Sequence, residues 1–279
     1  MNQIFDERQC LLGEGPLWHP ERQQLFWFDI LNNRLLTLEK GQPKQWQFDE
    51  FVSAAGWVTQ DALLIASESQ LFLFDLNTGQ SQKLFELEAD NPMTRSNDGR
   101  ADAFGGFWIG TMGKNAETGA GSIYRFYKGE VRRLFKNITI SNSICFTPDG
   151  RATYFADTAT NEIKKVDLDA EGWPAAPPET FIDLTAKKLN PDGSVVDADG
   201  YLWNAQWGAS RVARYSPKGE FVSAVQFSAE QVSCPAFGGP DLKTLFATSA
   251  ADGLSGTDDG KTFVYEAGIK GQPEHRVRL

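Results

Sequence analysis

The chain has 279 residues, of which 41% are hydrophobic and 23% charged, a composition typical of a globular protein. Its 37 acidic and 27 basic residues give a formal net charge of -10, and no run of Lys and Arg offers a binding patch for a phosphate backbone. The N-terminus lacks the basic start and apolar stretch of a signal peptide, and no segment approaches the roughly 18 apolar residues of a membrane span. We therefore expect a cytoplasmic protein that binds neither nucleic acid nor membranes.

Cysteine and histidine are scarce, and their positions argue against several kinds of site. The three cysteines, Cys10, Cys145 and Cys234, are far apart and include no C-x-x-C pair, which favours buried thiols over disulfides or a Cys-rich zinc site. His19 and His275 are the only histidines, and no G-x-S-x-G motif is present. A Ser-His-Asp hydrolase is therefore poorly supported.

A short apolar and aromatic run returns six times along the chain. The runs start at Leu25, Leu71, Phe107, Thr153, Tyr201 and Thr244, which are 46, 36, 46, 48 and 43 residues apart. A period in the forties suits a unit of about four short strands. The spacing predicts an all-β chain in which residues 1–279 form a single domain, a six-bladed β-propeller with four-stranded antiparallel blades.

The segments between these runs also favour strands over helices. Alternating stretches rich in β-branched and aromatic residues start at Gly121, Asn161 and Ser210, each after a core run and a short polar break. Turn residues stand at 148–150 and 198–200, where Pro, Asp and Gly preset or tolerate turn angles. These stretches are expected to be hairpin partners of the core runs.

Alignment of the repeats reveals one equivalent position in each unit, ten to thirteen residues before its core aromatic or the aliphatic residue that takes its place. These positions hold Glu14, Ala54, Asn97 with Asp98, Asn142, Asp192 and Cys234. Four of the six carry an oxygen-bearing side chain beside a Gly or Ser. Because the first strand of every propeller blade lines the central channel, we expect these side chains to converge at one channel mouth.

Carboxylates and side-chain amides gathered in this way are suited to hard divalent cations. A cation would relieve the repulsion between Glu14 and Asp192. The alternative for any single position is a turn residue between strands, since Asp-Gly and Asn-Asp-Gly are common in turns.

Four segments of the chain resemble the SMP-30/gluconolactonase/regucalcin-like family. They are LGEGPLW from Leu12, RSNDG from Arg95, the stretch 142–150 and PDG from Pro191. The match covers essentially the whole chain in order, and within the family it looks closest to bacterial sugar lactonases that act on aldonolactones.

The resemblance implies a cation site and a substrate site in the same channel mouth. One divalent cation would be bound by Glu14, Asn142 and Asp192, with Asp192 also the general base. Arg95 and Asn97 match the substrate-contacting pair of the family.

Two residues depart from the family pattern. Ser96 stands where a bulky residue or proline is common, and Ser143 follows Asn142 where glycine is usual. We expect these departures to alter the shape of the pocket more than cation binding.

The resulting prediction is a metal-dependent hydrolase that opens a sugar lactone to the aldonic acid and works as a monomer. The cation would polarise the carbonyl while Asp192 accepts a proton from water. Ca²⁺, Mg²⁺, Mn²⁺, Zn²⁺ and Fe²⁺ all stay open as the cation. Another metal-dependent esterase or phosphotriesterase, and a non-catalytic calcium-binding propeller, are the alternatives. Trp108 and Trp203 are expected in blade packing, whereas Trp207, at the end of its strand, could pack or face a sugar.

Overall fold

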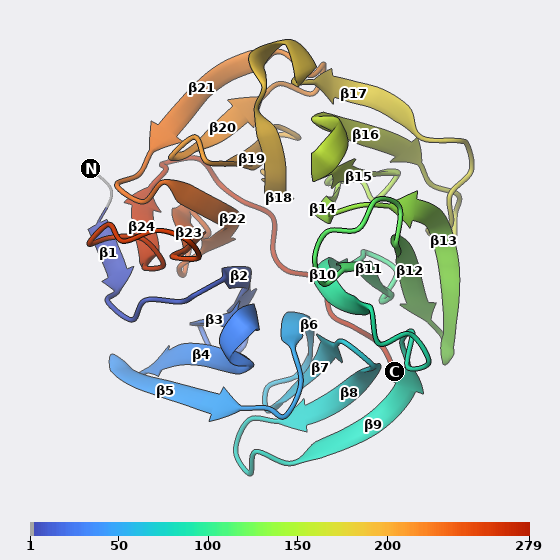
Figure 1. The fold of residues 1–279 in the computed structure, drawn as a ribbon, viewed down its shortest axis with the longest axis vertical. Helices are drawn as coiled ribbons and strands as arrows, with labels where there is room; N and C mark the ends of the chain where they lie inside the picture. The colour runs from blue at the N-terminus through green and yellow to red at the C-terminus, as the bar shows by residue number, and fades with distance from the viewer. Residues whose placement is uncertain (1–2) are drawn as a thin grey trace.

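Six four-stranded antiparallel sheets surround a central axis in the computed structural model, which describes residues 3–279 (Figure 1). Residues 1 and 2, the start of the predicted domain 1–279, lie outside the described residues. The prediction of an all-β, six-bladed propeller is confirmed. None of the helices in residues 3–279 is long and apolar enough to cross a bilayer.

In blades 1 to 5 the strands follow chain order from the axis outward. Blade 1 consists of β2 (Gly13–His19), β3 (Gln24–Asp29), β4 (Arg34–Glu39) and β5 (Gln42–Gln47); blade 2 of β6 (Val52–Thr59), β7 (Ala62–Ser67), β8 (Gln70–Asp75) and β9 (Ser81–Glu86); blade 3 of β10 (Thr94–Ala101), β11 (Phe107–Gly113), β12 (Gly121–Tyr127) and β13 (Glu130–Ile138). Blade 4 consists of β14 (Ser141–Phe146), β15 (Ala152–Asp157), β16 (Glu162–Asp167) and β17 (Glu179–Asp183); blade 5 of β18 (Asn190–Val196), β19 (Leu202–Trp207), β20 (Arg211–Tyr215) and β21 (Phe221–Gln226). Three short 3₁₀ helices connect strands: η1 (Ile30–Asn32), η2 (Thr158–Thr160) and η3 (Thr185–Lys187).

The sixth blade combines strands from both ends of the chain. It contains β22 (Gln231–Gly238), β23 (Thr244–Ala250) and β24 (Thr262–Glu266), and its outer strand is β1 (Gln3–Asp6). Gln3 pairs with Val264 and Ile4 with Phe263. The N-terminal strand therefore closes the ring by hydrogen bonding to the C-terminal blade.

Five of the six predicted core runs fall on the second strand of a blade, and one does not. The run that starts at Leu71 forms β8, the third strand of blade 2. The second strand of that blade is β7, whose sequence ALLIAS is buried but contains no aromatic residue. In blade 2 the second strand is aliphatic, so the aromatic run marks the third strand instead. The interval before this run is therefore longer, at 46 residues, and the interval after it is shorter, at 36 residues.

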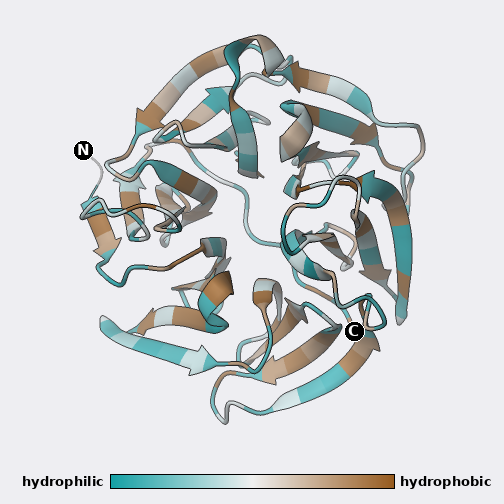
Figure 2. Ribbon diagram, in the orientation of Figure 1, coloured by the Kyte–Doolittle hydropathy of each residue, from teal (hydrophilic) through white to brown (hydrophobic). Residues whose placement is uncertain are grey.

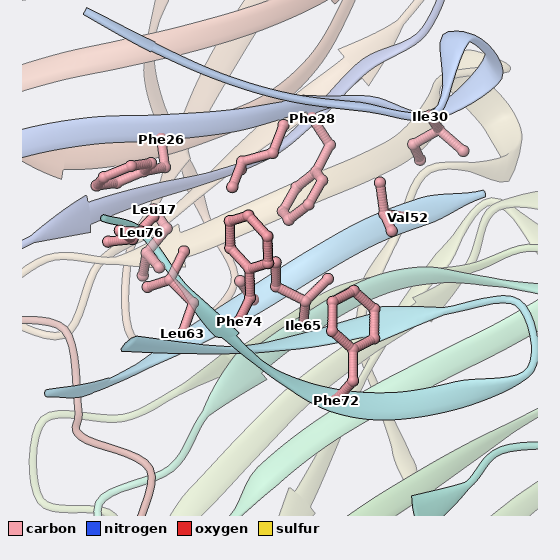
Figure 3. Packing of buried hydrophobic residues seen from close by; sticks show 12 residues of the cluster. Leu17, Phe26, Phe28, Ile30, Val52, Leu63, Ile65, Phe72, Phe74 and Leu76 are labelled. Atoms are coloured by element: carbon pink, nitrogen blue, oxygen red, sulfur yellow. The ribbon is translucent and has the colours of Figure 1, made fainter. Parts of the chain in front are cut away.

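Adjacent blades are joined by apolar side chains that interdigitate between their sheets. Figure 3 shows this layer between blades 1 and 2, where Phe26 and Phe28 of β3 lie near Leu63 and Ile65 of β7. All four side chains are at most 1% exposed, and burying each one contributes about 1.5–3 kcal/mol. The outer strands β5 and β13 are largely hydrophilic and face solvent (Figure 2).

The last residues of the chain cross the centre of the ring (Figure 1). Gln272 donates from Nε2 to the carbonyls of Phe146 and Val196, the final residues of β14 and β18. Glu274 forms an ion pair with Arg100, and its carbonyl accepts a hydrogen bond from Trp57 Nε1. The segment thus ties the C-terminal ends of the inner strands together and leaves their N-terminal ends as the mouth of the channel.

Candidate functional site

A cavity of about 340 Å³ opens where the inner strands begin, and all five predicted site residues line it. Glu14 belongs to β2, Arg95 and Asn97 to β10, Asn142 to β14 and Asp192 to β18. The repeat predicted this convergence for Glu14, Asn97, Asn142 and Asp192, and the family resemblance added Arg95. Four separate blades supply the five residues. The rest of the lining comes from Leu12, Leu31, Met112, Lys114, Ala116, Ile140, Thr158, Trp207 and Asp252.

Each inner strand carries a β-bulge at the position that the repeat alignment identified. The pairing register shifts between Glu14 and Leu17 in β2, between Asn142 and Cys145 in β14, and between Pro191 and Ser194 in β18. The same shift occurs in β6, β10 and β22. A bulge inserts residues that lack a ladder partner and turns their side chains away from the strand's regular alternation. Asn97 and Asp192 lie within a bulge, whereas Glu14 and Asn142 are the last paired residues before one.

The Glu14 and Asp192 carboxyl groups are buried together, at 5% and 4% exposure. They lie within hydrogen-bonding reach of each other. Burial and the nearby Asp98 carboxylate raise the pKa of Glu14 from 4.5 to about 8. Burial and the proximity of Glu14 raise the pKa of Asp192 well above its ordinary value. A pair of this kind requires either a shared proton or a cation.

Asn142 is oriented by hydrogen bonds from both sides of its amide. Its Nδ2 donates to Thr158 Oγ1 at 2.8 Å, and that hydroxyl donates to the Pro191 carbonyl at 2.7 Å. Its Oδ1 accepts from Asn97 Nδ2 at 3.1 Å. The amide nitrogen is therefore held away from a cation, while the oxygen remains on the side of the cavity.

Arg95 and Asn97 form a hydrogen-bonded pair within β10. Arg95 Nη1 donates to Asn97 Oδ1 at 2.7 Å and to the Ser96 carbonyl at 2.9 Å. Burial lowers the pKa of Arg95 to about 10, opposed by the carboxylates of Glu14 and Asp192. The guanidinium therefore remains charged at neutral pH, with its other N–H donors on the same planar group.

Asp98 and its neighbour Asn97 are the two residues of the β10 bulge, and they make different contacts. Its Oδ2 accepts a hydrogen bond of 2.6 Å from the Ile144 backbone N–H. It is buried but does not line the cavity, and burial raises its pKa to about 6 although the Ile144 N–H opposes the shift. Asp98 thus secures the bulge of β14 beside Asn142.

Ser143 holds the backbone of Asp192, a role that sequence reasoning did not assign. Its φ of 62° lies in the left-handed region, which explains why glycine would suit the position. Its Oγ donates to the Asp192 carbonyl, which also accepts from Asn204 Nδ2 at 3.2 Å. Thr158 was missed as well, because a threonine after a strand carries no distinctive sequence signal.

The residues fit a hard divalent cation by their chemistry. Two carboxylates and one amide oxygen are the donors that such ions prefer, and the single charge of Arg95 does not balance the two buried carboxylates when both are ionised. Within residues 3–279, no three Asp, Glu, His or Cys side chains gather in a way that could hold a metal ion. A cation here would therefore take Asn142 Oδ1 as its third protein ligand.

The histidines and cysteines take no part in the cavity. His19 is fully buried, with Nε2 bonded to the Thr59 carbonyl at 3.0 Å. His275 belongs to the C-terminal segment at the opposite end of the channel. All three cysteines are buried free thiols. The expectation of buried thiols is confirmed.

Comparison with known proteins assigns the chain to a family. An L-arabinolactonase of Azospirillum brasilense is 37% identical over 259 residues, which cover 90% of this chain and 85% of that protein. A 6-deoxy-6-sulfogluconolactonase of Pseudomonas putida is 31% identical, with 88% and 85% covered. The crystal structure of a calcium-binding protein, regucalcin, from Agrobacterium tumefaciens superposes with a TM-score of 0.98 at 43% identity, with 100% and 98% covered. Residues 12–251 match the model of the SMP-30/Gluconolactonase/LRE-like region, and the chain belongs to this family.

Proposed function

We propose that this protein is a divalent-cation-dependent hydrolase that opens a sugar lactone to the aldonic acid. The observation that carries the proposal is the cavity that Glu14, Asn142, Asp192, Arg95 and Asn97 line together. The relatives named for arabinolactone and sulfogluconolactone hydrolysis support the same class of reaction.

In this proposal Glu14, Asn142 and Asp192 hold the cation. The cation supplies Lewis-acid polarisation of the lactone carbonyl. Its identity among Ca²⁺, Mg²⁺, Mn²⁺, Zn²⁺ and Fe²⁺ is left to experiment, although the regucalcin relative is described as calcium-binding.

Asp192 acts as the general base that accepts a proton from the attacking water. Its position is maintained by Ser143 and Asn204, which both donate to its backbone carbonyl. Arg95 and Asn97 orient the sugar hydroxyls through hydrogen bonds, because the guanidinium presents several N–H donors and stays charged.

We also propose that residues 1–279 form one domain. The pairing of β1 with β24 supports this proposal.

The proposal is tested by stripping the purified protein with a chelator and measuring acid release in a pH-stat. Each candidate cation is added back separately, and the substrates are aldonolactones, aryl esters and phosphotriesters. We expect aldonolactone hydrolysis that disappears on chelation and returns with at least one cation. Preferential turnover of aryl esters or phosphotriesters would assign the site to another hydrolase class. Cation binding without turnover of any substrate would favour a non-catalytic calcium-binding propeller.

Cation binding should strengthen as the pH rises. Because the pKa values of Glu14 and Asp192 are raised, protonation of the pair stabilises the cation-free fold at low pH. This stabilisation is lost as the pH rises through the raised pKa values of the pair, and the pKa of Glu14 is about 8. A bound cation replaces the proton. We therefore expect the rise in Tm on adding cation to be larger at about pH 9 than at about pH 6.

Differential scanning fluorimetry at both pH values measures this effect. The Glu14→Gln variant serves as the control, because it removes one carboxylate and should lose most of the gain. Equal gains at the two pH values in the wild-type protein would contradict competition between the cation and a proton at this pair.

A further inference from the structure

Apolar side chains line the cavity beside the polar ones. They are Leu12, Leu31, Met112, Ile140 and Trp207, and of the described residues that line the cavity Trp207 is the one aromatic. Small-molecule sites generally combine apolar lining with a few polar groups that set the orientation of the ligand.

Trp207 and the proposed general base, Asp192, belong to neighbouring strands of blade 5. It is the last residue of β19 and pairs with Asn190 of β18, while its neighbour Gln206 pairs with Pro191. Asp192 follows Asn190 by two residues in β18, and Asp192 and Trp207 both line the cavity.

The end of β19 is held rigidly. Gln206 Nε2 donates to the Tyr215 hydroxyl at 2.8 Å, and Gln206 Oε1 accepts from Arg211 Nε at 2.6 Å. The Gln206 carbonyl also accepts from the Ala209 N–H at 2.9 Å. Trp207 is thus presented on a fixed strand end, which lowers the entropic cost of ordering it when a ligand binds.

Two tryptophans of β19 have different surroundings. Trp203 is 2% exposed, donates from Nε1 to Asp197 and packs edge-on against Phe237. Trp207 is only partly buried, and its indole stacks on no other ring in the described part of the chain. An indole left partly in water at a cavity retains apolar area that a ligand can bury.

We infer that Trp207 is the platform on which the ring face of a sugar lactone stacks, with the carbonyl edge directed at Glu14, Asn142 and Asp192. The inference rests on the proposed lactonase function and adds the residue that recognises the ring. Sugar rings present apolar C–H faces and polar rims, so a flat indole binds the face while Arg95 and Asn97 bind the rim.

The test compares Trp207→Ala and Trp207→Phe with a matched control, Trp46→Ala. Trp46 is also partly buried, but it belongs to the outer strand β5 and packs against Phe26 and Phe74. Two measurements are made on each variant: KM and kcat for a sugar 1,5-lactone, and the Kd of the corresponding sugar lactam by titration calorimetry. The lactam keeps the ring and hydroxyls and is resistant to opening, so its binding does not depend on turnover.

We expect Trp207→Ala to raise both KM and the lactam Kd by about tenfold with little change in kcat. Trp207→Phe, which keeps an aromatic face, should recover most of the loss, and Trp46→Ala should match the wild type. The phenylalanine variant also reports on the platform if the alanine variant fails to fold.

Failure of this inference is distinguishable from failure of the proposed function. If the wild type hydrolyses lactones but Trp207→Ala keeps wild-type KM and lactam Kd, the platform is overturned and the lactonase stands. If the wild type hydrolyses no lactone but binds the lactam in a Trp207-dependent way, the platform stands and the activity is overturned.

Discussion

The Asp192→Asn variant should lose most of its lactone hydrolysis, with kcat falling by about 10²–10⁴-fold, the usual contribution of a general base. Asparagine keeps an oxygen at this position but cannot accept the proton from water at neutral pH. Because Ser143 and Asn204 hold the backbone carbonyl rather than the side chain, the exchange should leave the local backbone in place. The measurement is steady-state kinetics in a pH-stat with the activating cation present.

Companion variants separate the two roles that Asp192 carries. Cation binding, measured by calorimetry, should survive in weakened form in Asp192→Asn and fall more steeply in Asp192→Ala, which retains no ligand oxygen. Asp199→Asn is the matched control, since Asp199 is an exposed carboxylate between β18 and β19 that does not line the cavity, and its loss should leave turnover close to that of the wild type. Activity that persists in Asp192→Ala after complete cation removal would disprove the mechanism.

Asp102→Ala is expected to reduce the free energy of unfolding by about 3–5 kcal/mol, because the substitution leaves the buried charge of Arg125 without its carboxylate partner. Asp102 and Arg125 form an ion pair of 2.7 Å in which both side chains are fully buried. The carboxylate also accepts from the backbone N–H groups of Phe104 and Gly106 and from Trp108 Nε1.

Arg125 has no other hydrogen-bond partner to replace this carboxylate. Its Nη1 and Nη2 atoms are buried without one in the described structure, and its guanidinium lies over the rings of Tyr127 and Trp173 at 4.2 and 4.4 Å. Removal of Asp102 therefore leaves the buried Arg125 guanidinium with only aromatic rings beside it, and burial of an unpaired charge is costly.

Equilibrium urea denaturation of Asp102→Ala and the wild type measures the loss. Glu86→Ala is the control, because the Lys83–Glu86 pair is 53% and 71% exposed and should contribute at most about 1 kcal/mol. A loss in Asp102→Ala no larger than that of the control would show that the aromatic rings alone stabilise Arg125.

The number of blades and the candidate site positions could both be predicted from the repeat. The period in the forties required about four strands a unit, and alignment of the units selected Glu14, Asn97, Asn142 and Asp192. The Leu71 run forms a buried strand as expected, but it is the third strand of its blade and not the equivalent of the other five runs, since blade 2 fills its second strand with aliphatic residues. Strand propensity does not distinguish a second strand from a third.

The direction of each polar side chain could not be predicted. Asn97 and Asp98 are neighbours in one motif, yet Asn97 lines the cavity while Asp98 accepts from the Ile144 N–H of the next blade. In the sequence, Ser143 is only a departure from a family pattern. Its left-handed backbone is seen in the structure, and its hydrogen bond to the Asp192 carbonyl depends on a contact between blades.

The sequence by itself determined the propeller, its blade count and the residue types of the proposed cation site, because these depend on periodicity and on which atoms a residue carries. Tertiary structure alone decided which of those residues meet. Register shifts occur in all six inner strands, at or beside the site residues, and a bulge arises from pairing with the neighbouring strand rather than from local propensity. Pairing between β18 and β19 likewise places Trp207 opposite Asn190, two residues before Asp192, a relation between strands that no single stretch of sequence encodes.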